Sequence, residues 1–163
     1  MIRLDAPWLT IPALQHLFDL FEKEGATLRL VGGSVRDGLL GLPVNDIDLA
    51  VDHSPQWVMS LLEKEHIKAI PTGIEHGTVT AVLEKRPYQI TTLRVDIKTF
   101  GRKAHVAFTE DWVKDALRRD FTINAIYADK NGQLFDPAGG LEDLKARQVR
   151  FIGNPVQRIK EDY

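Results

Sequence analysis

The sequence predicts an α+β domain built on one β-sheet with helices packed against it. Strand and helix patterns are mixed along the chain without a regular strand–helix–strand repeat, which argues against a parallel α/β fold. Two segments rich in strand-forming residues are joined by a short charged turn, which is typical of a β-hairpin. The chain has 163 residues, of which 44% are hydrophobic, so it is long and apolar enough for one domain with its own core.

The order of the elements follows from local patterns. Apolar residues recur at i, i+3, i+4 and i+7 from Leu14 to Phe21, so we expect a helix over 12–24 that ends at Gly25. The other expected elements are, in chain order, a strand at 28–31, a short helix from Ser34 to Gly41, a strand at 46–51, a helix capped by Ser54 and running to about Glu65, hairpin strands at 78–83 and 88–93, a helix from about Trp112 that carries Arg118, Arg119 and Asp120, two short strands around Asn131, a small helix at 141–146, and the start of a helix at 155–163. Residues 96–110 are polar and give no clear assignment.

Composition excludes several classes of protein. The chain contains no cysteine, so disulfides and thiolate-bound zinc play no part. No apolar run reaches the roughly 18 residues that a membrane span needs, and the first residues lack the pattern of a signal peptide, so we expect a cytoplasmic protein without a membrane partner. The net charge of -2 is unlike that of proteins that hold nucleic acid mainly through phosphate neutralisation. If the chain acts on RNA, either it contacts only the RNA end, or most of the RNA binding comes from elsewhere.

Two carboxylates occur in the predicted strand at 46–51. Because side chains alternate along a strand, Asp46 and Asp48 are expected on one face, with Cα atoms about 6.5–7 Å apart, while Ile47 faces the core. Converging carboxylates repel one another unless a cation lies between them, and hard oxygen ligands suit Mg²⁺. Taken alone, the pattern also fits an exposed acidic strand edge.

A glycine-rich turn precedes these acids by about ten residues. The strand at 28–31 runs into Gly32 and Gly33 and then into a helix, so backbone N–H groups converge where a triphosphate could approach closely. Arg36 lies one turn into that helix, and its guanidinium is able to bind phosphate oxygens through two parallel N–H···O bonds. In isolation this is also a tight strand–helix turn with a solvent-facing arginine. Together, an anion-binding turn and a pair of metal-binding acids are what chemistry on a magnesium-bound nucleotide requires.

Five motifs in order resemble the tRNA nucleotidyltransferase and poly(A) polymerase family of the polymerase-beta-type superfamily. They are Leu30-Val31-Gly32-Gly33-Ser34-Val35-Arg36-Asp37, Asp46-Ile47-Asp48, Arg118-Arg119-Asp120-Phe121-Thr122-Ile123-Asn124-Ala125, Asp136-Pro137-Ala138-Gly139-Gly140-Leu141-Glu142-Asp143-Leu144, and Arg158-Ile159-Lys160-Glu161-Asp162. The resemblance implies a mixed five-stranded sheet with helices on one side over residues 1–153, and the start of a truncated neck helix at 154–163.

The resemblance also implies roles for individual residues. Asp46 and Asp48 would hold the metal ions and carry catalysis. The residues expected to bind the nucleotide are Gly32, Gly33, Arg36, Arg119, Asp120, Asn124 and Asp162, the last within a template that reads the base. The 3′-OH of a tRNA would attack the α-phosphate of CTP or ATP, pyrophosphate would leave, and CCA would be added.

One position departs from the family pattern. Relatives carry a glutamate in the strand that matches 88–94, where this chain has Gln89. An amide is able to bond the attacking hydroxyl or a metal-bound water but does not accept a proton. We therefore expect a slower enzyme, or one that uses water or another carboxylate such as Asp96.

Other activities stay open at this stage. Residues 72–80 resemble the CCA-adding group, whereas poly(A) polymerases and enzymes that add only A or CC share the same head. Gln89 also motivates a catalytically weak nucleotide-binding module. The chain ends two residues before the arginine that the template motif needs, so we expect nucleotide binding without faithful base selection from these residues alone. Nothing in the sequence indicates an oligomeric state.

Overall fold

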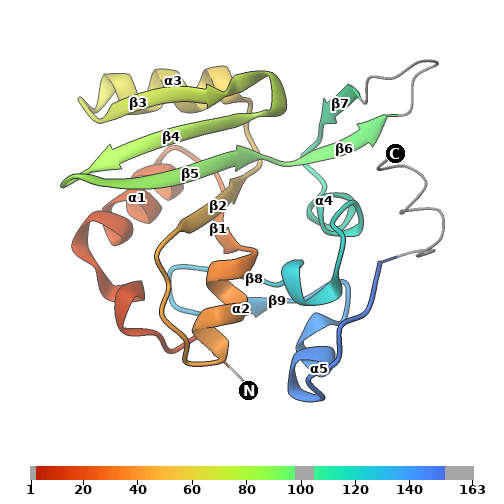
Figure 1. Cartoon of the computed structure of the whole chain (residues 1–163). Helices are drawn as coiled ribbons and strands as arrows, with labels where there is room; N and C mark the ends of the chain where they lie inside the picture. Colours follow the sequence, from red (N-terminus) through yellow and green to blue (C-terminus); the bar gives the residue numbers. More distant parts are fainter. Residues whose placement is uncertain (1–2, 98–104, 153–163) are drawn as a thin grey trace.

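The computed structural model describes residues 3–97 and 105–152, which form an α+β domain around a seven-stranded mixed sheet (Figure 1). The strands lie in the order β3-β4-β5-β2-β1-β8-β9. Their bounds are β1 Leu28–Val31, β2 Ile47–Val51, β3 Lys68–Gly73, β4 Thr78–Leu83, β5 Arg86–Thr92, β8 Tyr127–Ala128 and β9 Leu134–Phe135. A separate two-stranded ribbon consists of β6 (Arg94–Ile97) and β7 (His105–Phe108).

The helices are short and belong to both faces of the sheet. They are α1 Pro12–Lys23, α2 Gly33–Leu39, α3 Pro55–Lys64, α4 Trp112–Leu117 and α5 Gly140–Lys145, with 3₁₀ turns η1 Pro7–Thr10, η2 Ile74–His76 and η3 Thr122–Asn124. None of the helices in the described parts of the chain is long and apolar enough to cross a membrane.

Strand pairing determines which side chains share a face. β2 pairs with β5 in parallel and with β1 antiparallel, so β2 lies between them near the middle of the sheet. On one face, Ile47, Leu49 and Val51 of β2 join the main hydrophobic core with residues of α1 and α3. The even-numbered residues of β2 therefore point to the opposite face.

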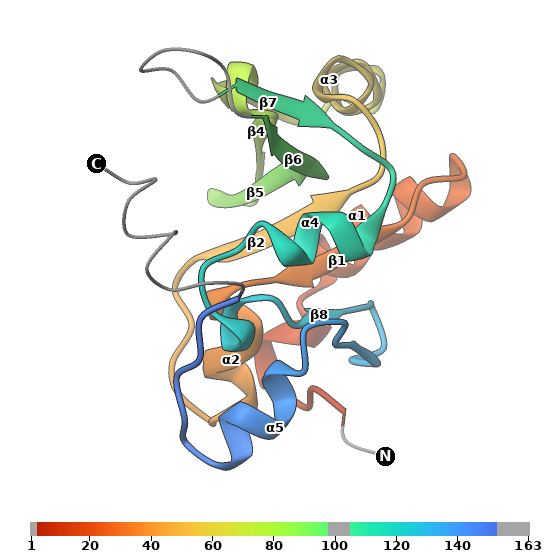
Figure 2. The same cartoon turned by 90° about the vertical axis from the view of Figure 1, so that its right-hand side faces the viewer.

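The opposite face is only partly covered. Figure 2 shows α4 in front of β1 and β2. A smaller hydrophobic cluster lies there and contains Val31, Ala50, Ala116 and Tyr127. The smaller cluster includes Ala50 of β2 but not Asp48. The beginning of β2 is therefore left open on its even-numbered side.

Most of the predicted elements are confirmed. The helices predicted at 12–24 and up to about Glu65, the strands around Asn131 and the small helix near 141 lie within a few residues of their expected bounds. The hairpin is confirmed with a two-residue turn, since Leu83 pairs with Arg86 around Glu84 and Lys85. The predicted neck segment at 154–163, including Asp162, lies outside the described residues.

Four details differ from the predictions. The main sheet has seven strands rather than five, because β3 extends it at one edge and β9 at the other. α4 packs against the face expected to be free of helices. Within the stretch that the sequence left unassigned, residues 96–97 belong to β6 and His105–Phe108 forms β7. β2 begins at Ile47 rather than Asp46, since continuing its register with β5 would place Asp46 opposite Pro87, which has no N–H to donate.

The helix at Trp112 also ends earlier than predicted. α4 stops at Leu117, so Arg118, Arg119 and Asp120 follow the helix instead of lying on it. The chain is drawn out of the helix because Phe121 forms an isolated β-bridge with Phe151, and the Asp120 carbonyl accepts the backbone N–H of Ile152 at 2.9 Å. The side chains after the helix are thereby redirected toward the sheet.

Candidate active site

The predicted acids meet at the beginning of β2. Asp48 is half-buried on the face opposite the main core, and Asp46 is exposed directly before the strand. Burial raises the pKa of the Asp48 carboxyl, the neighbouring Asp46 charge raises it further, and Arg119 opposes both effects. The two acids are therefore close enough to repel one another, and Arg119 lies within the same electrostatic environment.

Gln89 lies beside Asp48 on the adjacent strand. The parallel register of β2 and β5 pairs Asp48 with Gln89. Gln89 is exposed, and its other cross-strand neighbour is Thr80 of β4. The residue that replaces the usual glutamate of the family motif is thus next to one of the predicted metal-binding acids.

The glycine turn lies at the same end of β2. β1 pairs Leu30 with Leu49, so continuing this register brings Gly32 level with the first residue of β2. Gly32 has φ of +79°, a left-handed conformation that glycine adopts readily, and a Cβ there would meet no atom within 4 Å. At this position glycine is required by backbone conformation and not by crowding.

Arg36 and Asn124 connect two of the predicted motifs. The Arg36 Nη1 donates to Asn124 Oδ1 at 2.7 Å, and its Nε donates to Asp37 at 2.9 Å. Asn124 Nδ2 in turn donates to Asp120 Oδ1 at 3.3 Å. The hydrogen bonds place Arg36, Asn124 and Asp120 in one polar chain beside the glycine turn, although Arg36 and Asn124 are 88 residues apart in sequence.

Contacts with α5 fix the position of the 3₁₀ turn η3, which carries Asn124. Thr122 donates its hydroxyl to Asp143, which also accepts a bond from Arg150 Nε at 2.9 Å. A Cβ at Gly140 would lie 2.0 Å from the Thr122 carbonyl oxygen, so only glycine permits this approach. The motif at 136–144 therefore supports the position of Asn124.

A buried carboxylate orients Arg119. Asp115 is 1% exposed and accepts bonds from Arg119 Nη2 at 3.2 Å, Arg118 Nε at 3.1 Å and the Tyr127 hydroxyl at 2.6 Å. It also accepts the backbone N–H of Arg94 at 3.0 Å. Four donors from three parts of the chain thus converge on one carboxylate.

The charge of Asp115 is stabilised by these partners. Burial by itself would raise the pKa of Asp115, but the charges of Arg119 and Arg118 and the bonds from Tyr127 and the Arg94 backbone lower it. Burial also lowers the pKa of Arg118, while the net effect of its surroundings raises that of Arg119. Arg119 consequently stays cationic next to Asp48.

Sequence reasoning found most of these residues but missed Asp115, Tyr127 and Arg94. The spacing of Asp115 from Arg118 and Arg119, three and four residues, is a signal for ion pairs on a helix. No local pattern indicates that Tyr127 and Arg94 reach the same carboxylate. The structure groups Gly32, Gly33, Arg36, Asp46, Asp48, Arg119, Asp120 and Asn124 at one end of the sheet, and Asp162 lies outside the described residues.

The chemistry of this acidic pair fits a divalent cation. The Asp48 carboxyl is partly desolvated and repelled by Asp46, and a bound cation would relieve both effects. Within residues 3–97 and 105–152, no group of three or more His, Cys, Asp or Glu side chains is arranged to hold a metal ion. Mg²⁺ commonly binds one or two carboxylates and completes its shell with water and substrate phosphates, so two acids suffice.

Replacing Asp48 by asparagine is expected to stabilise the fold at neutral pH. Because the pKa of Asp48 is raised in the folded state, its contribution to stability is complete below its unfolded pKa, near 4, and is lost as pH rises through the folded pKa. Asp48→Asn should therefore raise the melting temperature by a few degrees at pH 7 and change it little at pH 3. Asp19→Asn, an exposed carboxylate on α1, is the control; a less stable Asp48→Asn protein at pH 7 contradicts the prediction.

Replacing Asp115 by asparagine should act in the opposite direction. Its pKa is lowered on folding, so its stabilising effect is present above the unfolded pKa and is lost as pH falls through the folded pKa. Asp115→Asn leaves the buried arginines without their counter-charge and should lower the free energy of unfolding by about 3–5 kcal/mol at pH 7. Urea unfolding followed by circular dichroism at pH 7 and below pH 4 measures the difference, which should narrow in acid. A loss as small as that of Asp19→Asn would refute it.

Comparison with known proteins agrees with the family resemblance of the sequence motifs. The model of the family described as "Poly A polymerase head domain" matches residues 28–150. The chain is 48% identical over 151 residues to the human protein named CCA tRNA nucleotidyltransferase 1, mitochondrial; the match covers 92% of this chain and 35% of the relative.

Two solved structures are also similar. The Bacillus stearothermophilus CCA-adding enzyme in complex with CTP superimposes with a TM-score of 0.81 at 35% identity, covering 94% of this chain and 37% of that chain. A tRNA nucleotidyltransferase complexed with a primer tRNA and an incoming ATP analog gives a TM-score of 0.69 at 31% identity, covering 88% and 40%. The chain thus spans little more than a third of the length of these proteins. With the family match over most of its length and the polar site at the start of β2, the chain belongs to the Poly A polymerase head domain family.

Proposed function

We propose that this chain is the catalytic head of an RNA nucleotidyltransferase that adds CCA to tRNA 3′ ends from CTP and ATP in a metal-dependent reaction. The observation that carries the proposal is the convergence of Asp46 and Asp48 with the glycine turn and Arg119 at one end of β2. The similarity to proteins named CCA-adding enzymes, one of them in complex with CTP, supports CCA addition over poly(A) synthesis. Because those proteins are much longer, activity is a property we assign to the complete protein.

Each part of the site has a role in this reaction. Gly32 and Gly33 let a triphosphate approach the backbone, and Arg36 binds its phosphate oxygens, exchanging its bond to Asn124 for one to the ligand. Asp120 and Asn124 lie together where a ribose would be contacted. Arg119 stabilises the negative charge that develops at the α-phosphate. We assign recognition of the base to the segment that begins at Asp162.

Asp46 and Asp48 are the residues that would hold Mg²⁺. When bound, the metal would neutralise phosphate charge and polarise the reacting phosphoryl group. The 3′-oxygen of the acceptor forms a bond to the α-phosphorus, the bond between that phosphorus and the oxygen bridging to the β-phosphate breaks, and pyrophosphate leaves. Gln89 orients the attacking hydroxyl through its amide, and the proton passes to water because an amide does not accept it.

A cytoplasmic location is the remaining part of the proposal. It rests on the sequence alone, and the human relative is named as mitochondrial.

A catalytically weak nucleotide-binding module is the alternative function, and it is favoured by one observation, namely the amide at position 89 beside Asp48.

An incorporation assay tests the proposed function. The complete protein is incubated with tRNA lacking its 3′ end, Mg²⁺, and labelled CTP and ATP separately and together. We expect C followed by A, ending after three additions, and a loss of at least about 10³-fold in rate for Asp46→Asn and Asp48→Asn because the metal ligands are removed. Glu63→Gln, an exposed acid on α3, is the control. Unlimited addition of A indicates a poly(A) polymerase, and binding without incorporation indicates the weak module.

The Gln89→Glu variant tests the role of the amide. A carboxylate next to Asp48 supplies the missing base and an additional ligand, and a general base contributes up to about 10²–10⁴-fold. We expect single-turnover CTP addition to become at least about tenfold faster, with Gln89→Ala slower than the parent. An unchanged rate in Gln89→Glu would show that proton transfer does not limit the reaction through this position.

A further inference from the structure

Tyr127 of β8 is a buried phenol that no step of the proposed reaction uses. The residue is 0% exposed, and its ring packs against Trp112 at a centroid distance of 5.3 Å and against Phe135 at 5.9 Å. Burial raises the pKa of the Tyr127 hydroxyl, so this group stays protonated and remains a hydrogen-bond donor in neutral solution. Because a substrate does not reach Tyr127, any part that it takes in the reaction acts through another side chain.

The hydroxyl of Tyr127 is bonded to the carboxylate that binds Arg119. It donates to Asp115 Oδ2 at 2.6 Å, and the same oxygen accepts Arg119 Nη2 at 3.2 Å. The hydroxyl–carboxylate distance is that of a strong charge-assisted hydrogen bond, whereas the guanidinium–carboxylate distance is long for such a pair. The position of Oδ2 is consequently fixed more firmly by Tyr127 than by Arg119.

The Arg119 guanidinium also lies near the Tyr127 ring. Its central carbon is 5.8 Å from the centre of the ring, within reach of a cation–π attraction. The Nε of Arg119 is buried and has no hydrogen-bond partner among the described residues. We propose that Tyr127 is a positioning residue, which holds the Arg119 guanidinium toward the reacting nucleotide through Asp115 and through its own ring. The inference rests on the proposed function, in which Arg119 stabilises charge at the α-phosphate.

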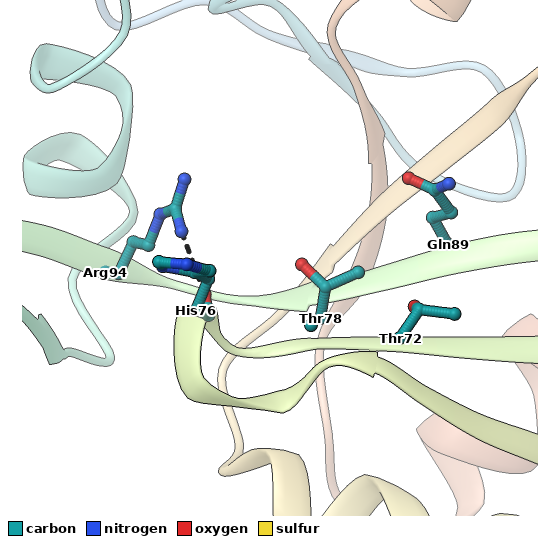
Figure 3. Close-up of a pocket in the computed structure, with 6 residues that line it drawn as sticks. Thr72, His76, Thr78, Gln89 and Arg94 are labelled. Carbon is teal, nitrogen blue, oxygen red and sulfur yellow. Dashed lines mark hydrogen bonds between the residues drawn. The ribbon is translucent and has the colours of Figure 1, made fainter.

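The other oxygen of Asp115 is bound independently of Tyr127. Asp115 Oδ1 accepts the backbone N–H of Arg94 at 3.0 Å and Arg118 Nε at 3.1 Å. The Arg94 side chain in turn donates to the His76 carbonyl at 2.9 Å. It lies at an open cavity of about 530 Å³, which is lined by Thr72, Gly73, His76, Thr78, Gln89 and Arg94 (Figure 3). Loss of the Tyr127 hydroxyl should therefore free Oδ2 while Oδ1 stays in place.

Tyr88 provides a matched comparison within the same chain. It is also 0% exposed, but its hydroxyl has no hydrogen-bond partner among the described residues. Its ring belongs to the main core on the other face of the sheet. The domain thus tolerates a buried tyrosine whose hydroxyl is unbonded, so burial of the ring does not by itself explain the hydrogen bond that Tyr127 makes.

Removing the two hydroxyls one at a time tests the role of Tyr127 in the complete protein. The variants are Tyr127→Phe, the control Tyr88→Phe, Arg119→Gln, and Tyr127→Phe combined with Arg119→Gln. Single-turnover addition of C to tRNA lacking its 3′ end is measured at saturating CTP, and the dissociation constant of CTP is measured separately. Exchange of the Arg119 Nε–H with solvent, followed by NMR without substrate, reports how firmly the guanidinium is held.

We expect Tyr127→Phe to slow single-turnover addition by about tenfold, as for the loss of one hydrogen bond to a charged group. The CTP dissociation constant should change by less than about threefold, because the charge of Arg119 remains. In the Arg119→Gln background the same substitution should cost less than about twofold, since both changes act through one contact. Exchange of the Arg119 Nε–H should become at least about tenfold faster in Tyr127→Phe, while Tyr88→Phe should match the parent within about twofold throughout.

Three results would overturn the inference: a rate for Tyr127→Phe equal to that of Tyr88→Phe, an equal loss with and without Arg119, or unchanged exchange at the Arg119 Nε–H. If circular dichroism shows that Tyr127→Phe is unfolded, Phe135→Leu replaces it, because that change loosens the Tyr127 ring and keeps the hydroxyl. A rate equal to that of the parent in Phe135→Leu would then overturn it. If the parent protein does not incorporate CTP, the proposed function fails, and the Nε–H exchange still decides whether Tyr127 holds Arg119.

Discussion

The arrangement of the site depends on one buried carboxylate. Asp115 accepts hydrogen bonds from Arg118 and Arg119, which follow α4 in sequence. It also accepts bonds from Tyr127 of β8 and from the backbone N–H of Arg94 at the start of β6. Removing any one donor would leave a charge or a polar group without its partner in a poorly solvated place. The Asp115 carboxylate therefore orients the Arg119 guanidinium near Asp48. It also fixes the backbone of Arg94, which lines the neighbouring cavity.

The sheet provides a rigid frame for opposing charges. One face of β2 is buried in the main core, which leaves Asp48 on the other face with limited solvation. Asp46 adds repulsion and Arg119 partly offsets it. Such an environment is unfavourable for the isolated domain, and a bound cation, as proposed above, would relieve it.

The two sides of β2 differ in chemistry. On the side of β1, the glycine turn and the chain formed by Arg36, Asn124 and Asp120 offer donors close to the backbone. On the side of β5, hydroxyl and amide groups surround a wider opening next to Arg94.

Periodicity, turn residues and short spacings act locally, and from them the sequence predicts the α+β class, most helices and strands, and the grouping of the glycine turn with Asp46 and Asp48. It does not predict the edge strand β3, the early end of α4, or the convergence of Arg94, Arg119 and Tyr127 on Asp115. These features arise from pairing and packing between segments distant in sequence. They form only in the folded chain, because strand pairing joins segments distant in sequence and because a buried ion network requires that water has been excluded from it.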